Sequence, residues 1–289
     1  MGDTHTATLP DGRRVTYADH GPPTGPVVLS CLGTPESRLV NPADVEHAER
    51  LGFRLLVPDR PGFGGSDPKP GRTLLDWPVD AGHLLDSLGV GSFAVVGASG
   101  GGPYAVACGV VLADRVSRVA LVAPADPQDA PAHGFVPREP AALRERGETM
   151  ARLLRDDPAG FYALVAPDLS DADREREAAM DRAAMDRTTE MFREAFRQGA
   201  DAYVEDHLIV GGPWSDLLPR LARPTRIWQG EDDNNVPAEA TRWVAERIPG
   251  AELTLLAGAG HALGRDAETA DAVMAEVYRW LLAPAGSAA

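Results

Sequence analysis

The 289-residue sequence contains few cysteines. Cys31 and Cys108 are the two present, and both stand in apolar segments, which is typical of small buried side chains rather than of a disulfide framework. We therefore expect no disulfide and a reducing compartment. A basic-then-apolar leader is also missing, and no apolar run approaches the roughly 18 residues that cross a bilayer. These absences predict a cytoplasmic protein.

Positive charge is scarce as well. Lys69 is the single lysine, and Asp and Glu outnumber Lys and Arg by 43 to 28, which gives a formal net charge of −15 and a pI of about 4.8. An acidic surface repels phosphate backbones and anionic lipids. We therefore expect neither nucleic acid nor a membrane as a partner. The bias toward Arg, Ala and Gly favours a high-GC bacterial source.

Apolar material is sufficient for a large core, since hydrophobic residues make up 44% of the chain and charged residues 25%. A hairpin is predicted at 4–9 and 13–18, around the turn sequence Pro-Asp-Gly. Continuous apolar runs then predict parallel strands covered on both faces. These runs span 27–31, 54–57, 93–96, 116–122, 227–229 and 252–256. Helical segments alternate with them at 44–51, 74–88, 103–112, 238–248 and 269–282. The pattern predicts an α/β fold with a mostly parallel eight-stranded sheet and helices on both faces.

The alternation stops once, between about residues 127 and 224. Charged helical segments, including 140–155 and 172–196, follow one another there without a convincing strand. We interpret residues 127–223 as a helical cap inserted into a core domain made of residues 1–126 and 224–289. The mixed charges of the insertion are typical of solvated helix faces.

The most informative segment is Gly97-Ala98-Ser99-Gly100-Gly101, a G-x-S-x-G pattern between a predicted strand and a predicted helix. This context is the one that a nucleophilic serine requires, because a sharp turn there exposes the hydroxyl above the sheet. The Gly100 N–H then points toward a developing oxyanion, assisted by the helix dipole. A nucleotide-binding loop is disfavoured because neither a Gly-Lys-Ser/Thr ending nor a G-x-G-x-x-G spacing is present.

A serine hydroxyl needs a base, normally a histidine that a carboxylate holds in one tautomer. His261 follows the last predicted strand, and Glu231, Asp232 and Asp233 follow the strand before it, so all lie where such sheets assemble their sites. The order serine, acid, histidine along the chain is the order in which α/β folds with a G-x-S-x-G serine carry their catalytic residues. The residues alone leave the choice among these acids and Asp126 open. Consecutive acids without alternate spacing do not predict a calcium loop, and we expect no metal and no cofactor.

Together these motifs resemble the α/β-hydrolase superfamily over nearly the whole chain outside the insertion. Segment 32–35, Leu-Gly-Thr-Pro, is similar to the family's His-Gly-x-Pro oxyanion loop, and segment 59–66 to the turn after its fourth strand. Segment 230–237 is similar to its G-x-x-D-x-x-V-P acid loop. The resemblance implies the α/β-hydrolase fold, Asp233 as the acid, and the Thr34 N–H as the second oxyanion donor.

Three positions depart from the family pattern. Leu32 stands where the family usually has a histidine, whose polar side chain helps to hold the oxyanion loop. Glu36 stands where glycine is frequent and places a carboxylate near the entrance of the site, with Arg38 as its expected partner. Gln229 replaces a frequent histidine, a substitution that we attribute to packing.

The serine separates this chain from haloalkane dehalogenases and epoxide hydrolases, because members resembling those use an aspartate at the same turn. We expect acyl chemistry on a small-molecule substrate: an ester, lactone or thioester with a hydrophobic group. Ser99 would attack the carbonyl, His261 would accept its proton and later protonate the leaving group, and water would release the acyl group. Two alternatives stay open, a biosynthetic cyclase or acyltransferase and a ligand-binding protein on the hydrolase fold.

The cap is expected to contribute a hydrophobic wall to a substrate pocket above Ser99, as lids that exclude water do. We assign this role to Phe161, Tyr162 and Trp214, with Leu32 contributing from the oxyanion loop. A monomer and a homodimer are both compatible with the sequence.

Overall fold

The computed structural model describes residues 4–131, 139–264 and 266–284. Within them, eight strands form one sheet in the order β1-β2-β4-β3-β5-β6-β7-β8. The strands are β1 (Thr4–Thr8), β2 (Arg14–His20), β3 (Val27–Cys31), β4 (Arg54–Pro58), β5 (Phe93–Ala98), β6 (Val116–Val122), β7 (Thr225–Gly230) and β8 (Glu252–Leu256). β1 pairs with β2 and β2 with β4 in antiparallel register, and the other neighbours are parallel. The predicted mostly parallel sheet is confirmed.

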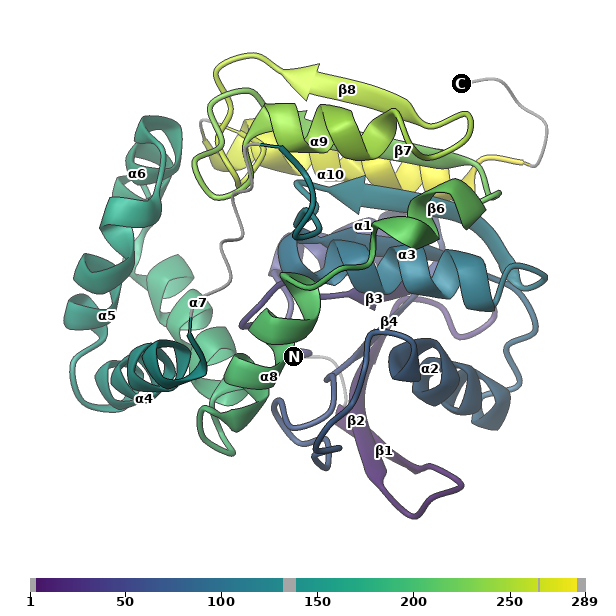
Figure 1. The fold of residues 1–289 in the computed structure, drawn as a ribbon, viewed down its shortest axis with the longest axis horizontal. Helices are drawn as coiled ribbons and strands as arrows, with labels where there is room; N and C mark the ends of the chain where they lie inside the picture. Colours follow the sequence, from purple (N-terminus) through teal and green to yellow (C-terminus); the bar gives the residue numbers. More distant parts are fainter. Residues whose placement is uncertain (1–3, 132–138, 265, 285–289) are drawn as a thin grey trace.

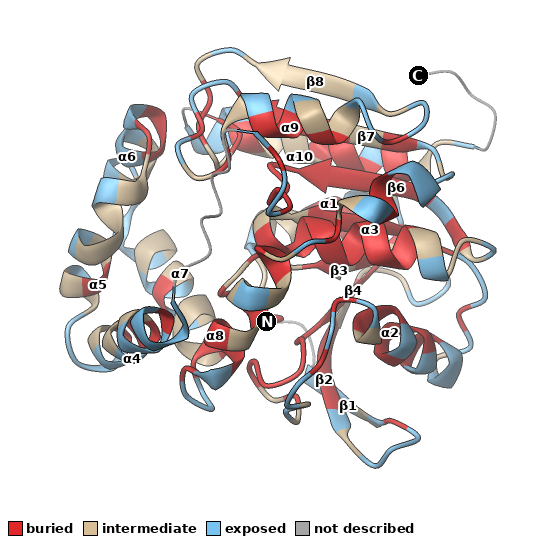
Figure 2. Cartoon of the chain, in the orientation of Figure 1, coloured by how far each residue is buried: buried red, intermediate tan, exposed pale blue. Residues whose placement is uncertain are grey.

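Two apolar cores lie on opposite faces of this sheet, because successive side chains of a strand point to opposite sides. Leu29, Leu56 and Val95 belong to one core, whereas their neighbours Val28 and Leu55 belong to the other. The first core is covered by α2 (Asp76–Ser87), α3 (Gly102–Val111) and α9 (Ala238–Ala245), and the second by α1 (Pro42–Leu51) and α10 (Ala267–Leu282). Figure 2 shows that the central strands and α3 are the most continuously buried elements.

The helices between β6 and β7 gather beside the end of the sheet to which the parallel strands point (Figure 1). They are α4 (Pro140–Asp156), α5 (Pro158–Val165), α6 (Asp171–Ala178), α7 (Arg182–Ala195) and α8 (Asp201–Val210), with short 3-10 turns at Ala166–Asp168 and Ser215–Arg220. They enclose a small apolar core of their own around Leu154, Phe161 and Tyr203. These helices lie within residues 127–223, and we keep the name cap for them, although their function as a cap stays a prediction.

One helical segment was expected at 172–196, and this expectation is wrong. The chain forms two helices there, because α6 ends at Ala178 and the Asp181 side chain caps α7 by accepting a hydrogen bond from the Ala184 N–H at 2.7 Å. A capping aspartate satisfies a backbone donor that a continuous helix would satisfy itself. The break separates α6, which contacts the loop after β8, from the rest of the cap.

The last part of the predicted cap packs on the main core. Trp214, Leu217 and Leu218 are buried with residues of α3 and with Val210 at the end of α8, in the main core rather than in the cap core around Phe161. Trp214 also donates from its indole N–H to the Val210 carbonyl at 2.8 Å. The chain therefore rejoins the core before β7 begins.

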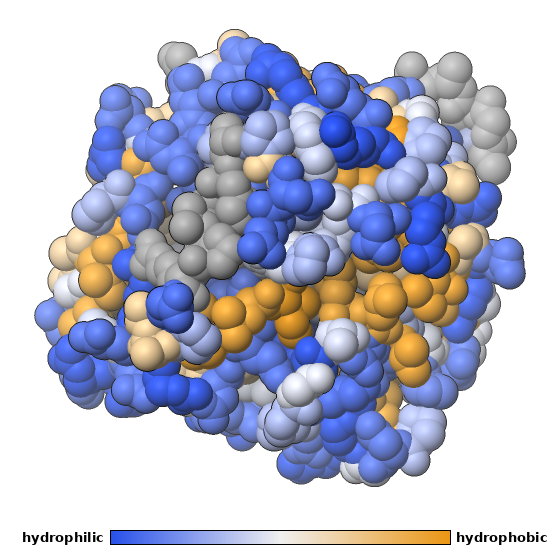
Figure 3. Space-filling view, viewed as in Figure 1, coloured by the Kyte–Doolittle hydropathy of each residue, from blue (hydrophilic) through white to orange (hydrophobic). Residues whose placement is uncertain are grey.

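The surface is mostly polar, but Figure 3 shows an apolar band across the middle of the face drawn. The large hydrophobic residues that the described part of the chain leaves exposed are Leu75, Val79, Val111 and Leu208. Cys31 and Cys108 are buried free thiols. None of the helices in the described ranges combines the length and apolar character needed to cross a bilayer.

Candidate active site

Ser99 lies where β5 ends and a 3-10 turn, Ser99–Gly101, leads into α3. Its φ is +49°, a left-handed conformation that is uncommon for a residue with a side chain. The Ser99 carbonyl accepts a hydrogen bond from the Ala125 N–H at 2.9 Å, which fastens the turn to the loop after β6. The half-buried Ser99 therefore lies at the carboxyl edge of the sheet and at a helix N-terminus, as the elbow motif requires.

Glycine is required at two positions around this serine. A Cβ on Gly97 would lie 2.5 Å from the Gly101 carbonyl oxygen and 2.6 Å from the Ala105 Cβ, so a side chain cannot fit between β5 and α3. A Cβ on Gly100 would overlap the Thr34 hydroxyl and lie 3.2 Å from the Thr34 backbone nitrogen. The two residues predicted to donate to the oxyanion, Thr34 and Gly100, thus lie against each other.

Asp233 and His261 form the acid–base pair predicted from the sequence order. His261 Nδ1 lies 2.7 Å from Asp233 Oδ2, and the Asp233 side chain is completely buried. Since this bond uses Nδ1, Nε2 is the ring nitrogen left for the Ser99 hydroxyl. The described residues include no hydrogen bond between Ser99 Oγ and His261, and catalytic hydrogen bonds often tighten only when substrate is bound.

The Asp233 carboxylate is fixed by three further donors. Oδ1 accepts from the N–H groups of Asn235 (2.8 Å) and Val236 (3.0 Å), and Oδ2 accepts from the Gln229 amide at 2.9 Å. Gln229 also donates to the Val236 carbonyl and accepts from Thr241. Our attribution of Gln229 to packing is therefore wrong, because its amide donates a hydrogen bond to the Asp233 carboxylate. Burial alone would raise the pKa of Asp233, but His261 and these donors lower it below its ordinary value.

Burial lowers the pKa of His261, but the negative charge and hydrogen bond of Asp233 outweigh it, and Asp173 and Glu36 add to the rise. The net result is a pKa above the ordinary histidine value of 6.5. A histidine with a raised pKa is a stronger base for the serine proton, provided that the pH keeps it neutral.

Asp173 of α6 is a site residue that sequence reasoning missed. Its carboxylate accepts from the backbone N–H groups of His261 (2.8 Å) and Ala262 (3.0 Å) and from the Ser170 hydroxyl (2.7 Å). The cap thereby holds the loop that carries His261. The pattern Ser170-x-x-Asp173 signals a helix start, but it does not indicate what the carboxylate faces.

Glu36 lies on the oxyanion loop and accepts a hydrogen bond from the Gly33 N–H at 2.7 Å. Its expected ion pair with Arg38 is wrong, because Arg38 instead pairs with Asp59 (2.8 Å) and with Glu194 of α7 (2.7 Å). Burial raises the pKa of Glu36, and Arg60 and His261 only partly offset this effect. Glu36 is therefore a carboxyl group of the active-site region itself.

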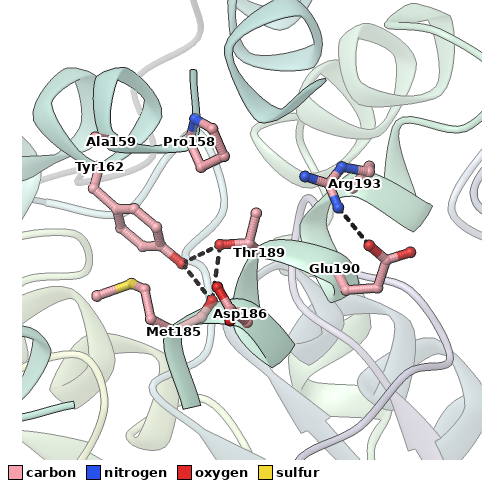
Figure 4. A pocket seen from close by; sticks show the side chains of 8 residues that line it. All are labelled: Pro158, Ala159, Tyr162, Met185, Asp186, Thr189, Glu190 and Arg193. Atoms are coloured by element: carbon pink, nitrogen blue, oxygen red, sulfur yellow. Dashed lines mark hydrogen bonds and ion pairs between the residues drawn. The ribbon is translucent and has the colours of Figure 1, made fainter. Parts of the chain in front are cut away.

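The four hydrophobic residues predicted for the substrate pocket lie in different places. Phe161 is buried in the cap core against Phe192, and Trp214 is buried in the main core, because each packs its ring between helices. Tyr162 lines an open cavity of about 560 Å³ between α5 and α7, whose lining does not include Ser99. Figure 4 shows its hydroxyl directed at Thr189, 3.1 Å away. Leu32 is half-buried beside the core under α1 and α10.

The described residues contain no group of three or more His, Cys, Asp and Glu side chains arranged to hold a metal ion.

Comparison with known proteins gives concordant matches. A family model described as alpha/beta hydrolase fold matches residues 26–264. Haloalkane dehalogenase 2 of Mycobacterium tuberculosis is 35% identical over 113 residues, a match that spans 37% of this chain and 37% of that protein. The bifunctional esterase/perhydrolase of Acinetobacter calcoaceticus is 25% identical over 270 residues, or 89% of this chain and 92% of that protein.

Solved structures match over almost the full length. A thermophilic esterase from Thermogutta terrifontis has a TM-score of 0.72 at 25% identity, with 98% of this chain and 100% of that chain covered. An esterase from Exiguobacterium antarcticum has a TM-score of 0.76 at 17% identity, with the same coverage, which is a likeness of fold.

Proposed function

Because the chain belongs to the α/β-hydrolase family, we propose that it is a serine hydrolase that cleaves a carboxylic ester, lactone or thioester through an acyl-enzyme on Ser99. The observation that carries the proposal is the 2.7 Å bond between His261 and the buried Asp233, at the same edge of the sheet as a serine with φ +49°. This combination is the one that activates a hydroxyl group.

In the proposed mechanism, Ser99 Oγ attacks the substrate carbonyl while His261 Nε2 takes its proton. Asp233 keeps Nδ1 protonated and stabilises the imidazolium that forms. The negative charge on the former carbonyl oxygen is bound by the backbone N–H groups of Thr34 and Gly100. His261 then protonates the leaving group. A water molecule attacks the acyl carbonyl while His261 takes its proton, and His261 returns a proton to Ser99 Oγ as the acyl group leaves.

The nature of the nucleophile favours acyl over alkyl transfer. Displacement of a halide requires a carboxylate at the elbow, and this chain has Ser99 there. The esterase/perhydrolase that aligns with 89% of the chain is consistent with the same choice. The proposal implies a small-molecule substrate.

The test is labelling of the purified protein by a fluorophosphonate, followed by intact mass. We expect one adduct on the wild type, and none on Ser99→Ala or His261→Ala, since the first variant lacks the nucleophile and the second its base. Asp233→Asn should label at least about 100-fold more slowly, because the histidine loses its tautomer partner. Asp232→Asn, a change at the exposed neighbouring acid, is the matched control and should label at the wild-type rate.

Retention of the adduct by Ser99→Ala would contradict the proposal, as would a folded wild type without any adduct. A panel of short-chain p-nitrophenyl esters, lactones and thioesters then ranks the substrate classes. Accumulation of an acylated enzyme at early times, seen as a mass increase that Ser99→Ala abolishes, distinguishes hydrolysis through an acyl-enzyme from direct attack by water.

A further inference from the structure

The oxyanion loop contains two successive peptide groups whose orientation decides where the Thr34 N–H points. A peptide group is planar, and its C=O and N–H point in opposite directions. Fixing the Gly33 carbonyl therefore fixes the Thr34 N–H, and fixing the Leu32 carbonyl fixes the Gly33 N–H. The histidine usual at position 32 is missing here, so another group has to hold these planes.

Arg60, from the turn after β4, makes these contacts. Its Nη1 donates to the Leu32 carbonyl, and its Nη2 donates to the Gly33 carbonyl at 2.9 Å and to the Thr34 hydroxyl at 3.0 Å. Glu36 binds the opposite side of the first peptide group through the Gly33 N–H. A guanidinium on the Gly33 carbonyl also polarises the peptide group and makes its N–H a stronger donor.

Arg60 is itself held by Asp206 of α8 in the cap. Asp206 accepts from Arg60 Nη2 at 2.7 Å and from Nε at 3.2 Å, and it also accepts from the Thr34 hydroxyl. Arg60 is 3% exposed and Asp206 0%. Figure 1 shows α8 between the other cap helices and the sheet, and α8 also packs against the Ser99–Gly101 turn.

A second arginine completes the charge balance without touching the oxyanion loop. Arg72 donates to Asp206 at 2.8 Å, to the Tyr104 hydroxyl at 2.8 Å and to Glu205 at 3.1 Å. Tyr104 in turn donates to Asp206 at 2.6 Å and lies with its ring under the Arg60 guanidinium. Buried charges persist only when paired in this way.

We infer that Arg60 is the positioning residue that orients the Thr34 N–H in the oxyanion hole, and that Asp206 of the cap holds Arg60 in the orientation this requires. The inference rests on the proposed function. It means that the cap, through one carboxylate, completes the catalytic machinery of the core. The donors to the Leu32 and Gly33 carbonyls come from Arg60, 28 positions after Leu32 in the chain.

The test compares Arg60→Lys with Arg72→Lys in the full-length protein. Both substitutions keep the charge and remove guanidinium donors from Asp206, two with Arg60 and one with Arg72, but only the first removes the donors to the Leu32 and Gly33 carbonyls. We expect Arg60→Lys to lower kcat and the fluorophosphonate labelling rate about 10- to 100-fold with little change in KM, because the transition state alone carries the oxyanion. Arg72→Lys should keep kcat within about threefold, whatever its effect on Tm.

The inhibition constant of a trifluoromethyl ketone is a readout that a loss of stability alone would not change. Its bound form carries an oxyanion, so its inhibition constant should rise in Arg60→Lys by about the same factor as kcat/KM falls. Equal losses of kcat in Arg60→Lys and Arg72→Lys, or an unchanged inhibition constant, would overturn the inference.

A second pair of variants covers the case in which Arg60→Lys does not fold. Thr34→Val is nearly isosteric and removes only the hydroxyl that links Arg60 to Asp206, whereas Thr34→Ser keeps it. We expect the serine variant to retain most of the labelling rate and the valine variant to lose about tenfold. Equal rates in the two variants would overturn the inference while wild-type labelling still upholds the serine hydrolase. A wild type that is not labelled overturns both.

Discussion

At the scale of the residue, Gln229 shows how a side chain at a strand end can govern a catalytic acid. It is completely buried, and its amide contacts the Asp233 carboxylate, the Val236 carbonyl and the Thr241 hydroxyl. Hydrogen bonds to a charged acceptor are worth more than those between neutral groups. The orientation of Asp233, and through it that of His261, therefore depends on this amide.

We predict that Gln229→Met lowers kcat/KM about tenfold, because methionine fills the same volume without donating to Asp233. The pKa of Asp233 should rise, since one of the donors that stabilise its charged form is lost. Gln229→His, which restores a ring N–H donor, should retain more activity than the methionine variant. The measurement is kcat/KM on one ester together with Tm. If the methionine variant matches the wild type in both, Gln229 serves packing alone.

Residue identities in contiguous motifs were predictable from the sequence, whereas contacts between distant residues were not. The backbone of an elbow is determined locally, so Ser99 could be singled out from a few neighbours, whereas Asp233 was selected among adjacent acids by the resemblance of residues 230–237 to a family motif. The contact of Asp173 with His261 joins residues 88 positions apart, and that of Asp206 with Arg60 joins residues 146 apart. An acidic residue on a charged helix gives no signal of which loop it will meet.

At the scale of the element, α6 holds the loop that carries His261 through hydrogen bonds from the backbone of that loop. Asp173 accepts two consecutive backbone N–H groups, and a Cβ on Gly260 would collide with its carboxylate, so the helix and the loop are in direct contact. The negative charge also raises the pKa of His261. The position of α6 therefore influences the geometry of the His261 loop, and the charge of Asp173 influences the basicity of His261.

We predict that Asp173→Asn shifts the acid limb of the pH dependence of kcat/KM to lower pH. His261 must be neutral to accept a proton, so activity is lost as the pH falls through its pKa, which lies above 6.5 in the wild type. Removing the Asp173 charge lowers that pKa. Asp171→Asn makes the same change at an exposed position of the same helix and should leave the limb in place. A limb that moves equally in both variants, or in neither, would contradict a specific role for Asp173.

Strands and helices of the core could be predicted to within about three residues, but those of the cap could not. Buried strands are continuous apolar runs, and their ends coincide with turn residues. In the insertion, α6 and α7 are both charged helix formers, and Asp181, which caps α7, is one aspartate among many in that segment. The sequence therefore indicated helices there without indicating where one ends.

At the scale of the whole molecule, a half-buried carboxyl group at the contact of α1 with α10 connects pH to stability. Asp44 of α1 accepts a hydrogen bond from Tyr278 of α10 at 2.9 Å. Burial raises its pKa from 3.8 to about 6; the Tyr278 bond and His47 lower it, and the charges of Glu36 and Asp271 raise it further. The folded state therefore resists ionisation of this carboxyl group, whereas the unfolded state does not.

We predict that Asp44→Asn is more stable than the wild type at pH 8, by about 1 to 3 kcal/mol. A raised carboxyl pKa destabilises the folded state as the pH rises. This loss of stability is absent below pH 3.8 and complete above about pH 6. Asparagine avoids the loss while still accepting a hydrogen bond from Tyr278. The advantage should disappear near pH 4. Urea unfolding at both pH values measures it, with the exposed Glu46→Gln on the same helix as control. An advantage that is equal at the two pH values would refute ionisation as the cause.

Two carboxylates of the cap hold loops of the core, and this has a consequence for replacing the cap of this protein with another. Asp173 and Asp206 belong to the insertion, while the loops that they hold belong to the flanking sheet. A lid taken from another hydrolase by recombination would replace both carboxylates and leave Arg60 buried without its partner. We expect such a chimera to fold poorly or to be inactive until aspartates are restored at both positions.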